Sequence, residues 1–117
     1  MRGFILVISR NSNLRRFCVD NLVIRGYVAV GVASIENECQ VLLHNEEPQL
    51  ILMCGELVQL EPELTTLHNQ YKLEAIPVGI ITVQKPEREW VNHWNIAGYI
   101  AYRIDTQRLM AMVHAWL

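Results

Sequence analysis

Five short apolar runs, separated by stretches with helical spacing, limit the folds open to this chain. The first run, Phe4–Ile8, is a continuous FILVI with no polar alternation, which is typical of a strand buried on both faces. Helices between such strands act as crossovers, so the strands are expected to run parallel with helices on both faces of the sheet. The other predicted strands are Val28–Val32, Leu50–Met53, Val78–Val83 and Tyr99–Ile104.

The stretches between the runs carry signals for the start and end of helices. A helix is predicted over Leu14–Arg25, with N-caps offered by Asn11-Ser12-Asn13 and an end at Gly26, because asparagine and serine are preferred N-caps and glycine is common after the last turn. Pro62 is predicted to open the third helix, and Gly98 to end the fourth. The remaining helices are predicted from Ser34 toward Pro48, with Cys39, Leu42 and Leu43 inward, and over Thr106–Trp116.

Length and composition indicate a single domain spanning residues 1–117. Hydrophobic residues make up 51% of the chain and charged residues 19%, which is typical of a globular protein. The net charge of -2 supplies no basic surface for phosphates, so we expect no direct nucleic-acid binding by this domain. Cys18, Cys39 and Cys54 form no Cys-x-x-Cys pair, which favours a reducing cytoplasmic location. No apolar run approaches the roughly 18–20 residues that span a bilayer, so no membrane role is expected.

A doubly wound sheet places its functional site at the carboxyl ends of the strands. In this chain Ser9 and Arg10 follow the first predicted strand, Cys54 the third and Asp105 the fifth, and Thr82 lies near the end of the fourth. The sequence lacks G-x-G-x-x-G and G-x-x-x-x-G-K-[ST], and no two histidines have the i, i+4 spacing of metal ligands. We therefore predict no cofactor, no metal and no catalytic residue.

Three segments resemble the receiver domain of two-component response regulators. Pro48–Cys54 (PQLILMC) is similar to that family's Pro-Asp-Leu-Ile-Leu-Leu-Asp pattern, and Ile76–Thr82 (IPVGIIT) to its fourth strand. Ala97–Asp105 (AGYIAYRID) resembles the stretch before the lysine of the fifth strand. The order and spacing of these segments extend the resemblance over essentially the whole chain. It implies a CheY-like, flavodoxin-like α/β fold: a doubly wound, five-stranded parallel sheet of order 2-1-3-4-5 with five helices.

The chain departs from that family at the positions that carry its chemistry. The resemblance places Ser9 and Arg10 where an active receiver has two acidic Mg²⁺ ligands, Cys54 at the phosphoryl-accepting aspartate, and Asp105 at the lysine. Mg²⁺ prefers carboxylate oxygens, and phosphoryl transfer needs positive charge around the transferring oxygens. The resemblance therefore implies a degenerate pseudo-receiver that is not phosphorylated. One hypothesis is that Arg10 replaces the metal by pairing with Asp105 or Glu56.

Aromatic residues gather toward the end of the chain. Trp90, Trp94, Tyr99 and Tyr102 fall within thirteen residues, on the predicted fourth helix and fifth strand, and Tyr102 resembles the aromatic switch residue of receivers. Exposed aromatic patches mark partner surfaces. In receivers, the face formed by helix 4, strand 5 and helix 5 docks dimers and output domains. We therefore expect a non-enzymatic interaction module in signal transduction or transcription regulation, bound to a protein partner, an attached output domain or a second copy as a homodimer.

A second hypothesis is a redox or small-ligand sensor that uses the crevice around Cys54, Thr82 and Arg10. In this case the Arg10 cation would lower the pKa of the Cys54 thiol. The simpler interpretation is that Cys54 is a small buried apolar residue, Glu56 a solvated loop charge, and the Thr82 hydroxyl a partner for nearby backbone. A third hypothesis, an enzyme of another type, is disfavoured because the sequence shows no base, metal set or glycine cradle.

Overall fold

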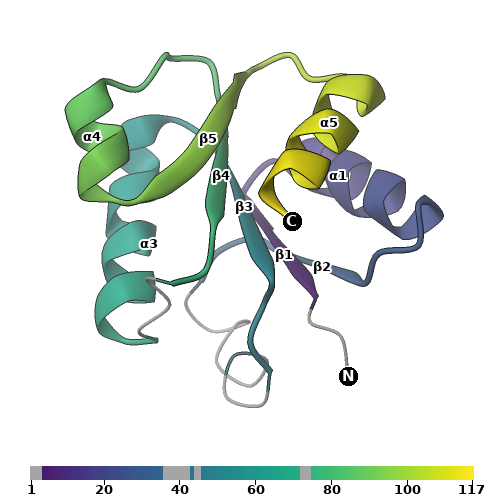
Figure 1. Ribbon diagram of the computed structural model, residues 1–117, viewed down its shortest axis with the longest axis horizontal. Coiled ribbons are helices and arrows are strands. Elements are labelled where there is room, and N and C mark those ends of the chain that lie inside the picture. Colours follow the sequence, from purple (N-terminus) through teal and green to yellow (C-terminus); the bar gives the residue numbers. More distant parts are fainter. Residues whose placement is uncertain (1–3, 36–42, 44–45, 72–74) are drawn as a thin grey trace.

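The computed structural model describes residues 4–35, 43, 46–71 and 75–117. These residues form a five-stranded sheet of order β2-β1-β3-β4-β5, in which every neighbouring pair is parallel (Figure 1). The predicted α/β class, the parallel pairing and the strand order are therefore confirmed. The strands are β1 (Ile5–Ser9), β2 (Ala29–Val32), β3 (Leu50–Cys54), β4 (Val78–Thr82) and β5 (Ile96–Ala101).

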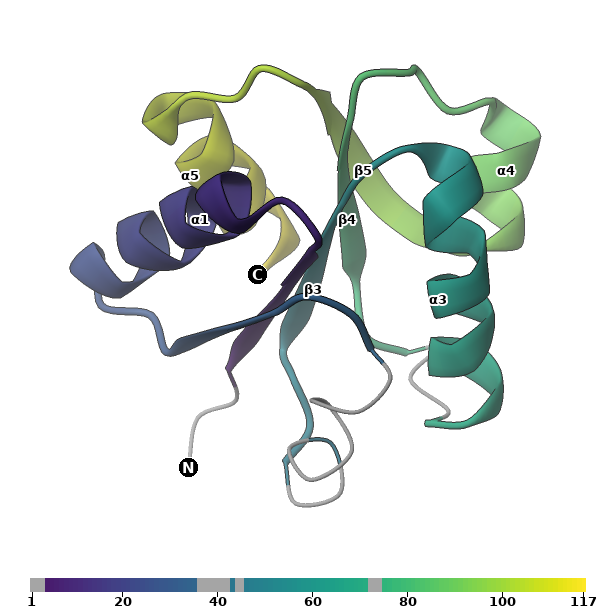
Figure 2. The ribbon, with the colours of Figure 1, turned by 180° about the vertical axis from the view of Figure 1, so that it is seen from behind.

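Helices cover both faces of the sheet. The helices α1 (Ser12–Ile24) and α5 (Thr106–Trp116) lie on one face, and α3 (Leu57–Asn69) and α4 (Arg88–His93) lie on the other (Figures 1 and 2). None of the helices in the described ranges is long and apolar enough to cross a membrane.

The predicted helix between Ser34 and Pro48 falls mainly on residues outside the described ranges, and Cys39 is one of them. Four of the five predicted helices are therefore seen in the part of the chain that the structure describes.

Burial on both faces explains the continuous apolar runs. Every residue of β1, β3 and β4 is buried. Neighbouring residues of a strand point to opposite faces, so Leu6 and Ile8 join the apolar cluster under α3 and α4, whereas Ile5 and Val7 join the cluster under α1 and α5. Both sets must be apolar, and the strand therefore shows no polar alternation.

The ends of α1 follow the sequence signals. The Asn11 side chain is the N-cap and accepts a hydrogen bond from the backbone N–H of Leu14 at 3.1 Å. After the C-cap residue Arg25, Gly26 adopts a φ of 92°, a left-handed conformation that glycine reaches without steric cost. The predicted stop at Gly26 is confirmed, whereas the helix begins at Ser12, two residues before the predicted start.

The prediction that Pro62 opens the third helix is wrong. The helix α3 begins at Leu57, and Pro62 lies inside it. Proline in a helix interior removes one backbone hydrogen bond, but the apolar positions Leu57, Leu60 and Leu64 continue at helical spacing across it. Leu60 and Leu64 are fully or almost fully buried, so packing against the sheet offsets the lost bond.

The boundary between α4 and β5 also differs from the prediction. The helix ends at His93, and Asn95, with a φ of 56°, provides the left-handed turn that was predicted at Gly98. Gly98 instead lies inside β5, which runs over Ile96–Ala101 rather than Tyr99–Ile104. The strand therefore begins and ends three residues earlier than predicted.

Gly98 is glycine because an indole covers it. Gly79 of β4 and Gly98 of β5 are paired across the sheet, and both face the ring of Trp116 at the end of α5. A methyl group on either glycine would overlap that ring. Because neither glycine has a side chain, the Trp116 ring packs directly on the backbone of β4 and β5 and holds α5 against the edge of the sheet.

Gly98→Ala is therefore expected to destabilise the fold by about 1–3 kcal/mol, the usual cost of overpacking a well-packed site. Urea unfolding of the wild type, of Gly98→Ala, of Trp116→Ala and of the double variant measures the coupling between the two positions. The alanine at position 98 should cost much less once the indole is absent. An equal cost of Gly98→Ala in both backgrounds would contradict this packing.

Candidate functional site at the carboxyl ends of the strands

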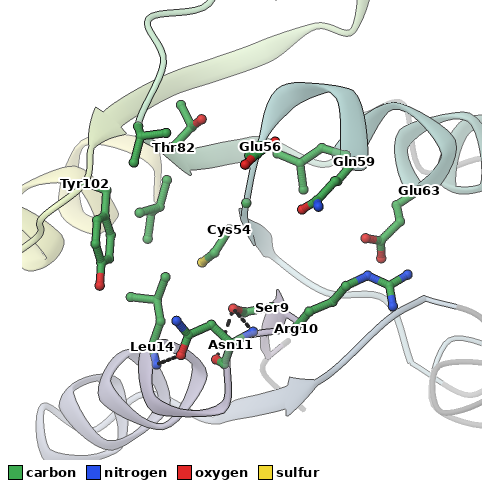
Figure 3. A pocket seen from close by; sticks show the side chains of 14 residues that line it. Ser9, Arg10, Asn11, Leu14, Cys54, Glu56, Gln59, Glu63, Thr82 and Tyr102 are labelled. Carbon is green, nitrogen blue, oxygen red and sulfur yellow. Dashed lines mark hydrogen bonds between the residues drawn. The ribbon is translucent and has the colours of Figure 1, made fainter.

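A cavity of about 410 Å³ opens at the carboxyl ends of β1, β3 and β4 (Figure 3). Ser9, Arg10, Cys54 and Thr82 all line it. Ser9 and Cys54 are direct partners in the pairing of β1 with β3. The structure therefore brings together four of the five strand-end residues that the sequence singles out, because parallel strands end at one edge of the sheet.

Asp105 does not line this cavity, and the prediction that places it there is wrong. It is the N-cap of α5, where its carboxylate accepts a hydrogen bond from the backbone N–H of Arg108 at 2.8 Å. Because β5 ends at Ala101, the residue that follows this strand into the cavity is Tyr102. Figure 3 shows the Tyr102 ring on the side of the cavity opposite to Arg10.

The loop after β1 satisfies its own polar groups. The Ser9 hydroxyl donates to the carbonyl of Asn11 and accepts from the N–H of Asn11, both at 3.2 Å. The Arg15 guanidinium donates to the carbonyl of Ser9 at 2.6 Å. These contacts fix the wall of the cavity formed by β1 and the start of α1, and they hold Ser9 in place.

Arg10 is exposed and extends along the rim of the cavity. Figure 3 shows its guanidinium on the side of Glu63 and Gln59. Within the described residues, no ion pair joins Arg10 to Glu56 or Asp105, and Asp105 is engaged in capping α5. The hypothesis that Arg10 pairs with one of these carboxylates in place of a metal is not supported by this geometry.

Glu63 is a cavity residue that sequence reasoning missed. Because α3 begins at Leu57, six residues before Glu63, this glutamate lies on the buried face of the helix and is only 7% exposed. Its carboxylate accepts a hydrogen bond from the backbone N–H of Ile35 at 3.1 Å. The signal was available in the sequence, because position 63 falls on the same helical face as Leu60, Leu64 and Leu67 once the helix starts at Leu57.

The Thr82 hydroxyl has a local backbone partner. It accepts a hydrogen bond from the N–H of Gln84 at 3.4 Å, as the simpler interpretation predicts.

Cys54 lies at the floor of the cavity and has an unexpected neighbour. Its thiol lies close to that of Cys18, a fully buried residue of α1, and each thiol changes the pKa of the other. The Cys54 thiol lowers the pKa of Cys18, against the effect of burial. The Cys18 thiol, followed by burial, raises the pKa of Cys54 well above its usual value, although a weaker effect of Ser9 opposes this. The predicted lowering of the Cys54 pKa by Arg10 is therefore wrong.

The residues present do not fit a magnesium ion. The strand ends supply a hydroxyl, a guanidinium and a thiol, whereas Mg²⁺ prefers carboxylate oxygens. Glu63 is already bound to the Ile35 backbone, and Glu56 is exposed. In the part of the chain that the structure describes, no three His, Cys, Asp or Glu side chains gather in an arrangement that could hold a metal.

The four aromatic residues expected to form one surface lie in different surroundings. Trp90 and Trp94 pack against the apolar cluster under α3 and α4, and the Trp90 indole donates to the Glu61 carboxylate at 2.9 Å. Tyr99, which is 38% exposed, lies on β5, and Tyr102 lines the cavity. The two tryptophans therefore face α3, and the expected surface of α4, β5 and α5 does not contain all four residues.

A second, shallow groove lies between α3 and α4. Its volume is about 490 Å³. Two indoles and one imidazole form its apolar part, and three carboxylates surround them. The lining residues are Glu61, Glu87, Glu89, Trp90, His93 and Trp94.

Comparison with solved structures shows that this fold is that of response-regulator receiver domains. The chemotaxis protein CheY4 of Vibrio cholerae matches over the whole of both chains, with a TM-score of 0.85 at 12% identity. HP1043, an orphan response regulator of H. pylori, matches 98% of this chain and 96% of its own, with a TM-score of 0.75 at 19% identity. A CheY-like receiver domain protein from Methanospirillum hungatei JF-1 matches 98% and 93%, with a TM-score of 0.78 at 17% identity.

No protein-family model and no curated protein matches this chain. The likeness to solved structures, at such low identity, therefore establishes the receiver-type fold that the sequence resemblance implies.

Proposed function

We propose that this chain is a receiver-like signalling domain that accepts no phosphoryl group and acts by binding a protein partner. The observation that carries the proposal is the make-up of the cavity at the strand ends. In a fold shared with response-regulator receivers, this cavity is lined by Ser9, Arg10, Cys54 and Tyr102. The domain is accordingly proposed to be an interaction module, not an enzyme.

The cavity lacks the groups that phosphoryl transfer to a side chain requires. The residue at the end of β3 is Cys54, a buried thiol and not a carboxylate that could accept a phosphoryl group. Among the described residues, no group of three or more His, Cys, Asp or Glu side chains could hold the metal ion that would neutralise the transferring oxygens. Tyr102 brings no positive charge to the position after β5.

Incubation with acetyl phosphate and Mg²⁺ is therefore expected to leave the protein unmodified. Intact-mass spectrometry would show no species heavier by about 80 Da, the mass added by one phosphoryl group. A receiver domain that carries the acceptor aspartate, treated in parallel, confirms that the reagent is active. An adduct on this chain that maps to Cys54 or to another residue of the cavity would contradict the proposal.

The groove between α3 and α4 supports the proposal that the domain binds a protein partner. Tryptophan faces bind cations, and the two half-buried indoles of this groove are surrounded by three glutamates that add attraction for positive charge. We therefore propose that the partner presents a basic segment, rich in lysine or arginine, to this groove. In NtrX from Brucella abortus, the similar region makes up 26% of the chain, with a TM-score of 0.79. The proposed partner therefore includes the case of a second domain in the same polypeptide.

Binding of a basic segment is expected to depend on the glutamates of the groove. Titration with a lysine- and arginine-rich peptide, followed by tryptophan fluorescence, should show saturable binding, and an aspartate- and glutamate-rich peptide should not bind. Glu87→Gln/Glu89→Gln removes two exposed charges with little change in shape and should weaken binding roughly several-fold.

Tyr99→Ala is the matched control, because Tyr99 lies on β5 and not among the residues of this groove. It should bind the basic peptide as the wild type does. Equal weakening by Tyr99→Ala, or unchanged binding by the double glutamine variant, would place the partner surface elsewhere.

A further inference from the structure

Two cysteines far apart in the sequence meet beneath the cavity. Cys54 ends β3 on the face of the sheet that packs against α1, and Cys18 belongs to the same buried cluster. Leu14, one helical turn before Cys18, lines the cavity together with Cys54. The helix therefore carries Cys18 to the cavity floor beside Cys54, with both residues in one buried cluster.

We propose that Cys18 and Cys54 form an oxidation site, in which a peroxide converts the two thiols into one intramolecular disulfide. This inference goes beyond the proposed signalling function and does not depend on it. The site uses residues of the floor, whereas partner binding is proposed at the groove between α3 and α4.

Cys54 is the more accessible of the two thiols and lies next to polar residues, so we expect its sulfur to react with the peroxide first. Cys54 is 6% exposed through the cavity, whereas Cys18 is fully buried behind it. Figure 3 shows the Cys54 sulfur directed toward Ser9. Ser9 acts to lower the pKa of Cys54, against the larger effects of Cys18 and of burial. A peroxide is small and polar, which suits a cavity of about 410 Å³ walled by Ser9, Arg10 and Asn11.

The closeness of the two thiols allows the proton transfer that the reaction needs. Loss of the first proton from the pair leaves a thiolate on Cys18, whose pKa is lowered whereas that of Cys54 is raised. As the Cys54 sulfur attacks one peroxide oxygen, its proton passes to Cys18, a sulfur–oxygen bond forms and the oxygen–oxygen bond breaks. The leaving hydroxide takes a proton from solvent and becomes water.

The second step closes the disulfide. The Cys18 sulfur attacks the sulfenic acid of Cys54, a sulfur–sulfur bond forms, and the sulfur–oxygen bond breaks. The leaving hydroxide takes the Cys18 proton and becomes a second water. Two thiols are thus oxidised, and one peroxide is reduced to two waters.

The disulfide would tie the first half of α1 to the end of β3. Because Leu14 and Ser9 line the cavity beside this link, oxidation would change the shape of its floor. Cys18 is thus the second thiol of the proposed redox site around Cys54, and the sequence did not indicate it.

The test is oxidation of the full chain with hydrogen peroxide, followed by alkylation in denaturant and mass spectrometry. The wild type should lose about 2 Da, the mass of two hydrogen atoms, and only one of its three cysteines should then be alkylated. Non-reducing peptide mapping should find Cys18 joined to Cys54, and a thiol reductant should reverse the change.

Variants separate this site from the third cysteine. Cys39→Ser should still form the disulfide. Cys18→Ser should instead accumulate a sulfenic acid on Cys54, which dimedone traps, because the resolving thiol is absent. The proposal would be overturned if Cys18 and Cys54 stayed reduced in the native wild type, or if the only disulfide formed joined two chains through Cys39. The wild-type peptide map decides between these results even if a variant fails to fold.

Discussion

The pairing of β1 with β3 decides what the cavity of this protein is made of. These central strands are buried on both faces, and their register sets Ser9 beside Cys54 at the edge of the sheet. All other walls are arranged around this pair: α1 leaves from Ser9 through a loop closed by Asn11 and Arg15, and α3 follows Cys54. The chemistry of the site therefore follows from which residue ends each central strand. A hydroxyl and a thiol stand there, and the site is suited to thiol chemistry more than to binding a hard cation.

Much of the fold follows from local patterns in the sequence, because burial on both faces leaves a clear mark on the central strands. The stop of α1 also follows, and its start follows to within two residues, since the cap before the helix and the Gly26 turn after it act over a short range. The predicted end of α4 at Gly98 failed for a non-local reason. Glycine often ends helices, but Gly98 is needed because the ring of Trp116, the last residue of α5, packs against its backbone. No local pattern distinguishes these two uses of glycine.

The site shows the same division between local and long-range information. Ser9, Arg10, Cys54 and Thr82 were predictable because parallel strands share one functional edge. Cys18 was not, because its contact with Cys54 depends on how α1 packs on the sheet. Tyr102 replaced Asp105 through the three-residue shift of β5 alone. Glu63 was missed because the helix was predicted to open at Pro62, whereas α3 begins at Leu57 and turns this carboxylate toward the core.

This chain has a receiver-type fold, but the residues of its strand-end site do not suit a magnesium-dependent phosphoryl switch. We propose that this site does not bind Mg²⁺, whatever partner the domain binds elsewhere. The most direct measurement is a titration of the nitrogen-15-labelled protein with Mg²⁺, followed by amide chemical shifts in two-dimensional NMR. The account predicts no saturable shifts at Ser9, Cys54 and Thr82. Saturable shifts that converge on these amides would show a working metal site and would contradict it.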